Sequence, residues 1–277
     1  LGLRGRGFDI LNENIHKAHG MILVTGPTGS GKSTTLYAVL DQLKNVAVNI
    51  ITMEDPVEYR MPTINQGQVN AEIGFTFASG LRSILRQDPN VVMIGEIRDG
   101  ETATMAVQAA LTGHILLSTL HTNDAAGAIP RLIDMGVEPF LITSSLNAAI
   151  AQRLCRKICD HCKMSVEIPP AGLEDVKKEI AKLPKQEAEK VRGKPLTFYK
   201  GKGCEQCGDT GYRGRIGIFE ILPVTERIKE LTLERTGSSV LAEAGIAEGM
   251  ATLKQDGILK ALEGIPTLEE VWRVTKD

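Results

Sequence analysis

The feature that most constrains this chain is the run Gly26-Pro27-Thr28-Gly29-Ser30-Gly31-Lys32-Ser33, which matches the pattern G-x-x-x-x-G-K-[ST]. Residues 21–25 before it are apolar and typical of a buried strand, and residues 33–44 after it have the spacing of an amphipathic helix. Glycines in such a loop let backbone N–H groups curl around phosphate oxygens, while the helix directs its positive end at them. This context favours a phosphate-binding loop over a chance glycine-rich turn. The loop is expected to comprise Pro27, Thr28, Gly29, Ser30, Gly31, Lys32, Ser33 and Thr34.

The alternation of strand and helix continues after the loop. Residues 48–53, 91–94 and 115–119 are predicted strands, and residues 77–86, 101–112 and 125–135 are predicted helices. Strands that alternate with helices predict a parallel sheet with helices on both faces, which is an α/β fold. The last fifty residues are expected to form small helices, and Thr267-Leu268-Glu269-Glu270 predicts a capping box at the start of the final one.

Composition and charge narrow the class of protein. The 277 residues carry a net charge of −2, which gives no general reason to expect binding to nucleic acid or to an anionic membrane. We find no apolar run of the roughly 18 residues that a membrane span needs, and no signal peptide. We therefore expect a cytosolic protein whose membrane role, if it has one, depends on partners. The chain begins at Leu1 rather than Met, and we expect it to be part of a longer protein.

Two carboxylates follow predicted strands, where they could assist cleavage of a bound nucleotide. Glu54 follows the strand at 48–53, and Glu96 follows the strand at 91–94. Gly95 stands where P-loop proteins usually carry the acid on the Mg²⁺ side, so Glu96 is expected to take that role. Taken by itself, Glu54 is equally consistent with an exposed loop acid.

Basic side chains lie close to these carboxylates in the sequence. Arg82, Arg86 and Arg98 are candidates for an arginine finger, although a lone arginine more often makes a surface ion pair. His114 and His121 flank the strand at 115–119, and a histidine in such a place is more often structural than catalytic. These residues therefore stay open between a structural and a catalytic role on the sequence pattern alone.

The five cysteines are Cys155, Cys159, Cys162, Cys204 and Cys207. Four of them form two C-x-x-C pairs separated by 41 residues, 163–203. In a cytosolic protein such pairs suggest metal ligands before disulfides, and four thiolates suit tetrahedral zinc. The spacer is longer than in a compact zinc ribbon, so four reduced, unpaired cysteines remain the alternative. Cys155 is expected to be a small buried apolar residue, and His161 is a spare ligand.

Four segments occur in one order along the chain: GPTGSGKST, ITMEDPVE, LRSILRQDPNVVMIGEIRD and LLSTLHTND. This order resembles the assembly ATPases of type II secretion and type IV pili (the GspE/PilB type), with their Walker A motif, Asp box, atypical Walker B and His box. The resemblance continues through residues 211–222 and 248–274 and thus covers nearly the whole chain. It implies a RecA-like P-loop ATPase core (1–154), a tetracysteine zinc module (155–210), and a return strand with a small C-terminal helical subdomain (211–277).

The resemblance also implies a role for each matching residue. Lys32 and Ser33 bind the phosphates and Mg²⁺ of ATP or ADP, and Glu54 is the general base for the attacking water. Glu96 holds Mg²⁺ or its water shell, and His121 contacts the phosphate region. The metal ligands at the cysteine pairs, Cys159, Cys162, Cys204 and Cys207, hold Zn²⁺, as is usual for assembly ATPases.

Members of the family that this chain resembles form hexameric rings, in which the N-terminal domain of one subunit packs on the motor domain of its neighbour. We expect most of that domain to lie outside this chain. Arginines complete the nucleotide site in the ring, and Arg82, Arg86 and Arg98 are the candidates here. The expected partner is a platform protein of the inner membrane, so that the ATPase is cytoplasmic and peripheral to that membrane, with no direct contact to nucleic acid.

Other functions agree less well with the sequence. A pilus retraction ATPase shares the motifs but typically lacks the tetracysteine module. A nucleotide-binding regulatory module with little turnover has no need for both Glu54 and Glu96. The order of the motifs does not suggest a small-molecule kinase, and the near-neutral charge disfavours a motor that moves nucleic acid.

Overall fold

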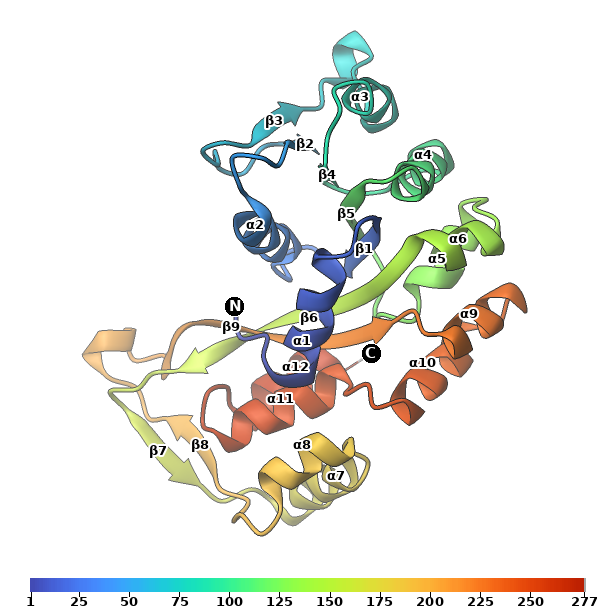
Figure 1. Ribbon diagram of the computed structural model, residues 1–277. Coiled ribbons are helices and arrows are strands. Elements are labelled where there is room, and N and C mark those ends of the chain that lie inside the picture. The colour runs from blue at the N-terminus through green and yellow to red at the C-terminus, as the bar shows by residue number, and fades with distance from the viewer. Residues whose placement is uncertain (277) are drawn as a thin grey trace. The chain divides into compact units, whose positions relative to one another are not determined.

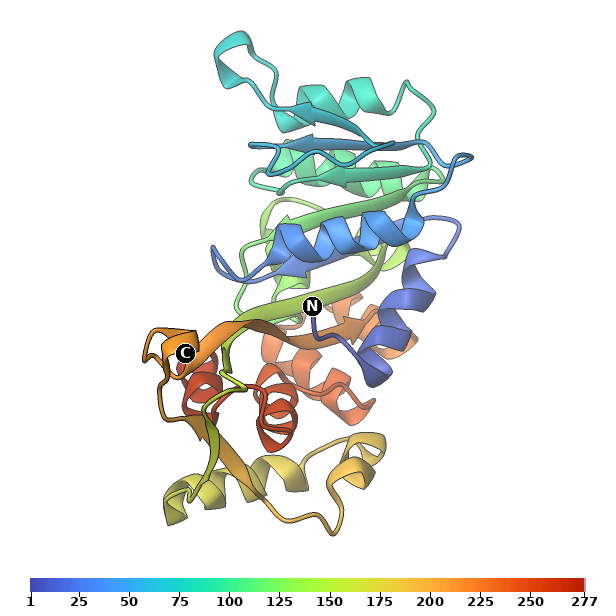
Figure 2. The ribbon, with the colours of Figure 1, turned by 90° about the vertical axis from the view of Figure 1, so that its left-hand side faces the viewer.

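The computed structural model describes residues 1–276. In it the apolar segment before the phosphate loop forms β1 (Gly20–Thr25), and all six residues of this strand are buried. β1 pairs in parallel with β5 (Ile115–Leu120) on one side and with β6 (Leu146–Ile158) on the other. Beyond β5 the parallel pairing continues through β4 (Val91–Ile94), β2 (Ile50–Glu54) and β3 (Asn65–Gln68). Figure 2 shows these strands stacked in that order. The predicted parallel sheet is confirmed.

Within residues 1–276 the principal sheet has seven strands in the order β3-β2-β4-β5-β1-β6-β9, with β9 (Tyr212–Pro223) at the far edge. The described chain divides into two compact units. We call residues 5–151 and 221–245 the phosphate-loop unit, and residues 1–4, 152–220 and 246–276 the cysteine unit. The three-part division expected from the sequence stays a prediction.

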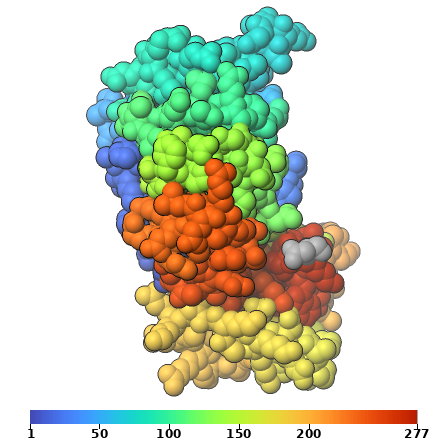
Figure 3. Space-filling model, turned by 90° about the vertical axis from the view of Figure 1, so that its right-hand side faces the viewer, coloured from blue at the N-terminus to red at the C-terminus, as the bar shows by residue number. Residues whose placement is uncertain are grey.

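Helices cover both faces of the sheet in the phosphate-loop unit. α2 (Lys32–Leu43) lies on one face, and α3 (Phe77–Ile84), α4 (Gly100–Leu111), α5 (Ala128–Asp134) and α6 (Pro139–Ser145) lie on the other (Figure 1). The unit also holds α1 (Gly5–Ile15), the short 3₁₀ helix η1 (Ala71–Ile73), α9 (Glu226–Leu233) and most of α10 (Ser238–Ala247). α9, drawn in orange, packs beside α6 (Figure 3). None of the helices in residues 1–276 is both long and apolar enough to span a bilayer.

The ends of α3 and α4 are set by local hydrogen bonds. Thr76 accepts the N–H of Ser79 in a reciprocal capping box, and Asp99 accepts the N–H of Thr102 at 2.8 Å. α4 is rich in small buried side chains, among them Ala103 and Ala106, which let it pack closely on the sheet. These caps fix where α3 and α4 begin, and the cap of α4 therefore ends the loop of residues 95–99, which carries Glu96 and Arg98.

The cysteine unit contains an antiparallel pair, β7 (Lys163–Val166) and β8 (Phe198–Gly201). The chain between these strands forms α7 (Pro170–Ala181) and α8 (Lys185–Val191). A 3₁₀ turn, η2 (Glu205–Cys207), follows β8, and α11 (Leu253–Leu262) and α12 (Leu268–Thr275) complete the unit. Asp175 of α7 accepts hydrogen bonds from Lys254 of α11 and Trp272 of α12, which ties the three helices together.

Three local features differ from the sequence analysis. β3 and β6 were not predicted, because Asn65–Gln68 is polar throughout and β6 mixes alanines with polar residues instead of alternating. Thr267 does cap α12 by accepting the N–H of Glu270. The Glu270 carboxylate, however, accepts hydrogen bonds from Arg156 and Arg273 instead of completing the predicted capping box.

Candidate nucleotide site and cysteine cluster

The phosphate loop leaves β1 and enters α2, as predicted. Gly26, Gly29 and Gly31 have φ values of 142°, 78° and 89°, a region that side-chain-bearing residues rarely adopt. Lys32 folds its ammonium back over the loop and donates to the carbonyls of Gly26 at 2.8 Å and Pro27 at 3.1 Å. The loop is therefore a tight backbone curl with a lysine amine held over it, which is the shape that a phosphate group requires.

Ser30 adds a second sign that the loop is built for a ligand. Its residue is 4% exposed, yet its hydroxyl has no hydrogen-bond partner among residues 1–276. A buried hydroxyl without a partner is costly unless a ligand or water satisfies it. Phosphate oxygens would supply the missing acceptor, so the residues present fit a nucleotide.

The carboxyl ends of the parallel strands bring the sequence-predicted residues together. The register pairs Thr25 of β1 with Leu120 of β5, and Ile94 of β4 with both Met53 of β2 and Ser118 of β5. The four strands therefore end at one edge of the sheet. The phosphate loop, Glu54, Glu96 and His121 each lie at or directly after such an end.

Glu54, the last residue of β2, is 3% exposed, and both of its carboxylate oxygens accept hydrogen bonds. One carboxylate oxygen accepts a hydrogen bond from the hydroxyl of Tyr37 on α2. The other accepts from Thr52 Oγ1 at 2.6 Å and Gln66 Nε2 at 3.1 Å. All three donors are neutral groups. Burial, and then the hydrogen bond to Glu54, raises the pKa of Tyr37, so the phenol stays a protonated donor at working pH.

Glu96 lies two residues after β4 in a different environment. It accepts hydrogen bonds from Arg98 and, at 3.0 Å, from His121 Nε2, and Arg98 also pairs with Asp55 at 3.2 Å. Burial acts to raise the pKa of Glu96, but the hydrogen bonds from Arg98 and His121 outweigh it and the pKa is lowered. Glu96 is therefore held in its charged form by two basic neighbours. The structure thus brings together Glu96, Arg98 and His121, three separate candidates from the sequence.

Arg82, on α3, and Arg86, two residues after that helix ends, lie elsewhere and are exposed. Arg82 pairs with Glu101 of α4 at 3.0 Å, and Arg86 donates to the backbone carbonyl of Arg82. Both arginines therefore have partners other than Glu96, whereas Arg98 pairs with Glu96.

The residues that hold Glu54 in place were not predicted from the sequence. Tyr37 falls within a correctly predicted helix, but nothing in the local pattern shows that its hydroxyl meets a carboxylate 17 residues later. Gln66 lies on β3, which was not predicted. Both contacts depend on the order of strands in the sheet, which a local pattern does not reveal.

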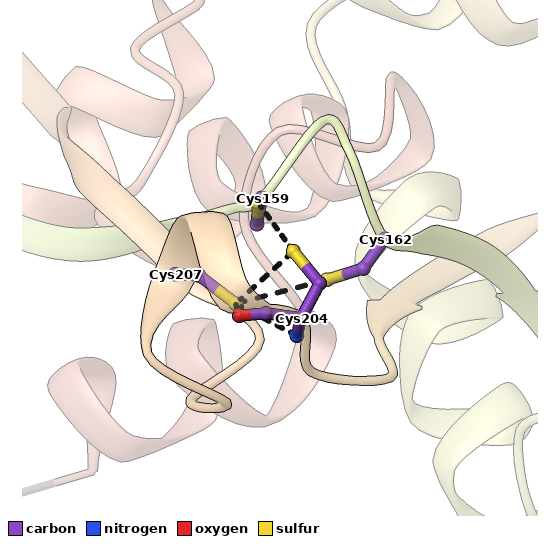
Figure 4. A group of neighbouring side chains, drawn as sticks. All are labelled: Cys159, Cys162, Cys204 and Cys207. Carbon is purple, nitrogen blue, oxygen red and sulfur yellow. Dashed lines mark hydrogen bonds between the residues drawn. The ribbon is translucent and has the colours of Figure 1, made fainter.

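The four paired cysteines meet at one point of the cysteine unit (Figure 4). Their Sγ atoms all lie within 4.8 Å of one another. Cys159 and Cys204 are 3.9 Å apart, Cys162 and Cys207 are 3.9 Å apart, and Cys204 and Cys207 are 3.7 Å apart. Tetrahedral zinc with Zn–S bonds of about 2.3 Å places its sulfurs about 3.8 Å apart, so the donor set fits this metal.

The long spacer between the cysteine pairs is folded. β7 and β8 pair antiparallel, with Lys163 opposite Gly201, and the N–H of Lys202 donates to the Cys162 carbonyl at 3.1 Å. This pairing returns the chain to the first cysteine pair. Burial acts to raise the pKa of Cys207, but N–H groups of Cys204 and Gly211 outweigh it and lower that pKa to about 7, which favours the thiolate that binds metal.

Cys155 stands apart from the cluster. It is fully buried, and burial raises its pKa to about 12, as expected of a small apolar residue. His161 is exposed and is not among the four clustered ligands.

The whole length of this chain is similar in sequence to known proteins. A model of the family described as "Type II/IV secretion system protein" matches residues 1–273. "Type II secretion system protein E" of Pectobacterium carotovorum subsp. carotovorum is 49% identical over 278 residues, which cover 100% of this chain and 53% of the relative. "Type IV pilus assembly ATPase PilB" of Thermus thermophilus is 49% identical over 271 residues, which cover 98% of this chain and 29% of the relative.

The fold of this chain is also similar to that of a solved structure. The crystal structure of "the Pilus Retraction Motor PilT and Bound ADP" is similar with a TM-score of 0.70 and 30% identity, covering 100% of this chain and 66% of that chain. This chain spans about half the length of the secretion protein E relative. Because the family match runs through residues 1–273 and includes both the phosphate loop and the four cysteines, the chain belongs to the type II/IV secretion system protein family.

Proposed function

We propose that this chain is the motor part of an ATP-hydrolysing hexamer that powers the assembly of type IV pili or type II secretion pseudopili. The observation that carries the proposal is the meeting of a phosphate loop with Glu54 and Glu96 at one edge of a parallel sheet. Binding alone requires only the loop, whereas hydrolysis requires groups that hold the metal and activate water. Relatives named as secretion protein E and as a pilus assembly ATPase support the assembly role.

The proposed division of labour starts from the loop. Lys32 and Ser30 contact phosphate oxygens, and the N-terminus of α2 faces the same group. Ser33 and Glu96 are the residues that would hold Mg²⁺, which when bound offsets the charge of the phosphates. Glu96 suits this task because its lowered pKa keeps it anionic. His121 and Arg98 pair with Glu96 and so fix the orientation of its carboxylate, and both would contact the phosphate region.

Glu54 is proposed as the general base. Its three hydrogen-bond donors are neutral, so its negative charge is held without being cancelled by a cation. A carboxylate offers about four lone-pair sites, of which these donors use three. The remaining site would accept the proton of the attacking water.

We propose a hexamer because two arginines are exposed on the surface of this chain and because the family that it resembles forms rings. Arg82 of α3 and Arg86, two residues after that helix, are exposed, and from there they would reach a neighbouring subunit and complete its nucleotide site. The proposed partner is an inner-membrane platform protein, and the location is the cytoplasmic side of that membrane, reached through this partner. We propose no direct contact with nucleic acid.

Zinc is proposed at Cys159, Cys162, Cys204 and Cys207, because the sulfur separations fit a tetrahedral site. This cluster favours an assembly motor over the second candidate, a retraction motor such as the PilT structure. We also propose the three-part division: core 1–154, zinc module 155–210 and return strand with helices 211–277.

ATP hydrolysis measured against protein concentration tests the proposal. Wild type should turn over ATP with a specific activity that rises with concentration, because a neighbour completes each site. Glu54→Gln should bind ATP without cleaving it, and Glu58→Gln, the same change four residues later, serves as the matched control. Turnover that is unchanged in Lys32→Ala would refute the nucleotide site. Binding without turnover at every concentration would favour a regulatory module.

A further inference from the structure

The hydroxyl of Tyr37 joins the nucleotide-binding helix to the proposed catalytic base. Tyr37 is 1% exposed on α2, five residues after Lys32. Its hydroxyl donates to Glu54 at the end of β2 and accepts the N–H of Glu58 at 3.3 Å. One phenol therefore fastens α2 to the loop that follows β2.

The contact decides how Glu54 is oriented. Thr52 and Gln66 hold one carboxylate oxygen from the sheet side. Tyr37 alone among these donors holds the other oxygen, and it does so from the helix that carries Lys32 and Ser33. The separation of Lys32 and Tyr37 along the helix axis is about 7.5 Å, a distance that the rigid α-helix fixes.

We infer that Tyr37 is a positioning residue, which sets the Glu54 carboxylate in register with the phosphate held by the loop. This inference rests on the proposed function, since it assigns a role in the hydrolysis proposed above. Because the phosphate contacts and the support of the base lie on one helix, a shift of α2 moves both together. The raised pKa of the phenol supports this role, because the hydroxyl remains a donor.

Tyr59 offers a matched control. Its ring meets the Tyr37 ring edge-on at 4.4 Å between centroids, and it is 53% exposed. Tyr59→Phe removes a hydroxyl from the same aromatic pair but leaves the three hydrogen bonds to Glu54 in place, whereas Tyr37→Phe removes one of them. The two variants differ only in which phenol loses its oxygen.

The experiment measures turnover and ADP affinity for wild type, Tyr37→Phe, Tyr59→Phe, Glu54→Gln and the Tyr37→Phe/Glu54→Gln double variant. A misplaced base should lower kcat about 10-fold to 100-fold in Tyr37→Phe, with ADP affinity unchanged. Tyr59→Phe should match wild type. In the Glu54→Gln background the second change should cost nothing more, because Tyr37 acts through Glu54. Single-turnover assays with labelled ATP resolve these slow rates.

Each contrary result points to a definite error. Equal kcat in Tyr37→Phe and wild type, a further loss in the double variant, or a parallel loss of ADP affinity would each overturn the inference. If Tyr37→Phe fails to fold, Tyr37→Phe/Glu54→Leu removes both partners, and recovery of the melting temperature supports the pairing, whereas no recovery overturns it. A wild type that shows no turnover above Lys32→Ala instead refutes the proposed function, and the pairing is then judged on melting temperatures alone.

Discussion

Replacing Glu270 should reveal how the C-terminal helix of the cysteine unit is attached. This carboxylate is 2% exposed, and its two oxygens accept four hydrogen bonds. Arg156 donates its backbone N–H at 2.9 Å and its guanidinium at 2.7 Å, and Arg273 donates twice at 2.8 Å. Burial acts to raise the pKa of Glu270, but Arg273 and Arg156 outweigh it, and the pKa falls from 4.5 to about 2.

The size of the effect follows from that pKa. A fall from 4.5 to about 2 corresponds to about 3 kcal/mol in favour of the charged, folded form. The side chains of Arg156 and Arg273 are 51% and 57% exposed, so water screens part of the attraction. We therefore expect Glu270→Gln to lower the free energy of unfolding by about 2 kcal/mol at pH 7.

The pH dependence has a definite sign. Because the pKa of Glu270 is lower in the folded state, its contribution is complete above the unfolded value near 4.5 and is lost as pH falls toward 2. The difference between wild type and Glu270→Gln should therefore be constant from pH 7 to 5 and shrink below about pH 4. Urea unfolding at several pH values measures it, with Trp272, the single tryptophan, as a probe on the same helix.

Glu269→Gln is the control, since Glu269 is exposed on the same helix. It should change stability by less than about 0.5 kcal/mol. A wild-type advantage over Glu270→Gln that does not change between pH 6 and pH 3 would refute the reasoning, because the stabilisation would then not arise from the charge. Equal effects of the two substitutions would show that the buried contacts of Glu270 contribute nothing beyond those of a surface acid.

Two further predictions concern the metal and the oligomer. Metal analysis should find about one zinc per chain. Chelation of this zinc should shift the fluorescence emission of Trp272, because its indole donates to Asp175 in the segment between the cysteine pairs. A folded, metal-free chain with four freely titrating thiols would count against the zinc site. Arg82→Ala should leave stability within about 0.5 kcal/mol, because its pair with Glu101 is exposed, yet lower turnover. Mixing it with inactive Lys32→Ala should restore activity if Arg82 serves a neighbouring site, and no recovery in mixtures would exclude that role.

The parts of this fold that local chemistry dictates could be predicted from sequence. The phosphate loop was predictable because its glycines and lysine occur at fixed spacing between an apolar strand and a helix. The β1, β4 and β5 segments were predictable because strands buried on both faces are continuous apolar runs. The meeting of the four cysteines was inferred from spacing and resemblance, and the structure confirms it through the β7–β8 pairing.

The parts that were missed depend on tertiary pairing. β6 contains Asn147, Gln152 and Arg153 among its alanines, so neither alternation nor a long apolar run marks it, yet it pairs with β1 along the centre of the sheet. β3 is polar and is a strand only because β2 offers it a partner. The Glu270 carboxylate was expected to cap its own helix, but the two arginines offer stronger, charge-assisted hydrogen bonds.

The two carboxylates at the sheet edge differ in what holds them, and this difference argues for distinct tasks. Glu96 is held by Arg98 and His121, so its charge is stabilised and its pKa is lowered, which suits a metal ligand but weakens a base. Glu54 is held by neutral hydroxyl and amide groups, which fix its direction without supplying a countercharge. Removing the cationic partner of Glu96 should therefore change its chemistry. In Arg98→Gln the negative charge of Glu96 is less stabilised, so its pKa should rise. If Arg98→Gln reduces the affinity for Mg²⁺ with ADP while Tyr37→Phe spares it and reduces turnover, the tasks are separate as argued. If both variants impair the same step, the two acids act as one unit and the assignment of a single base is wrong.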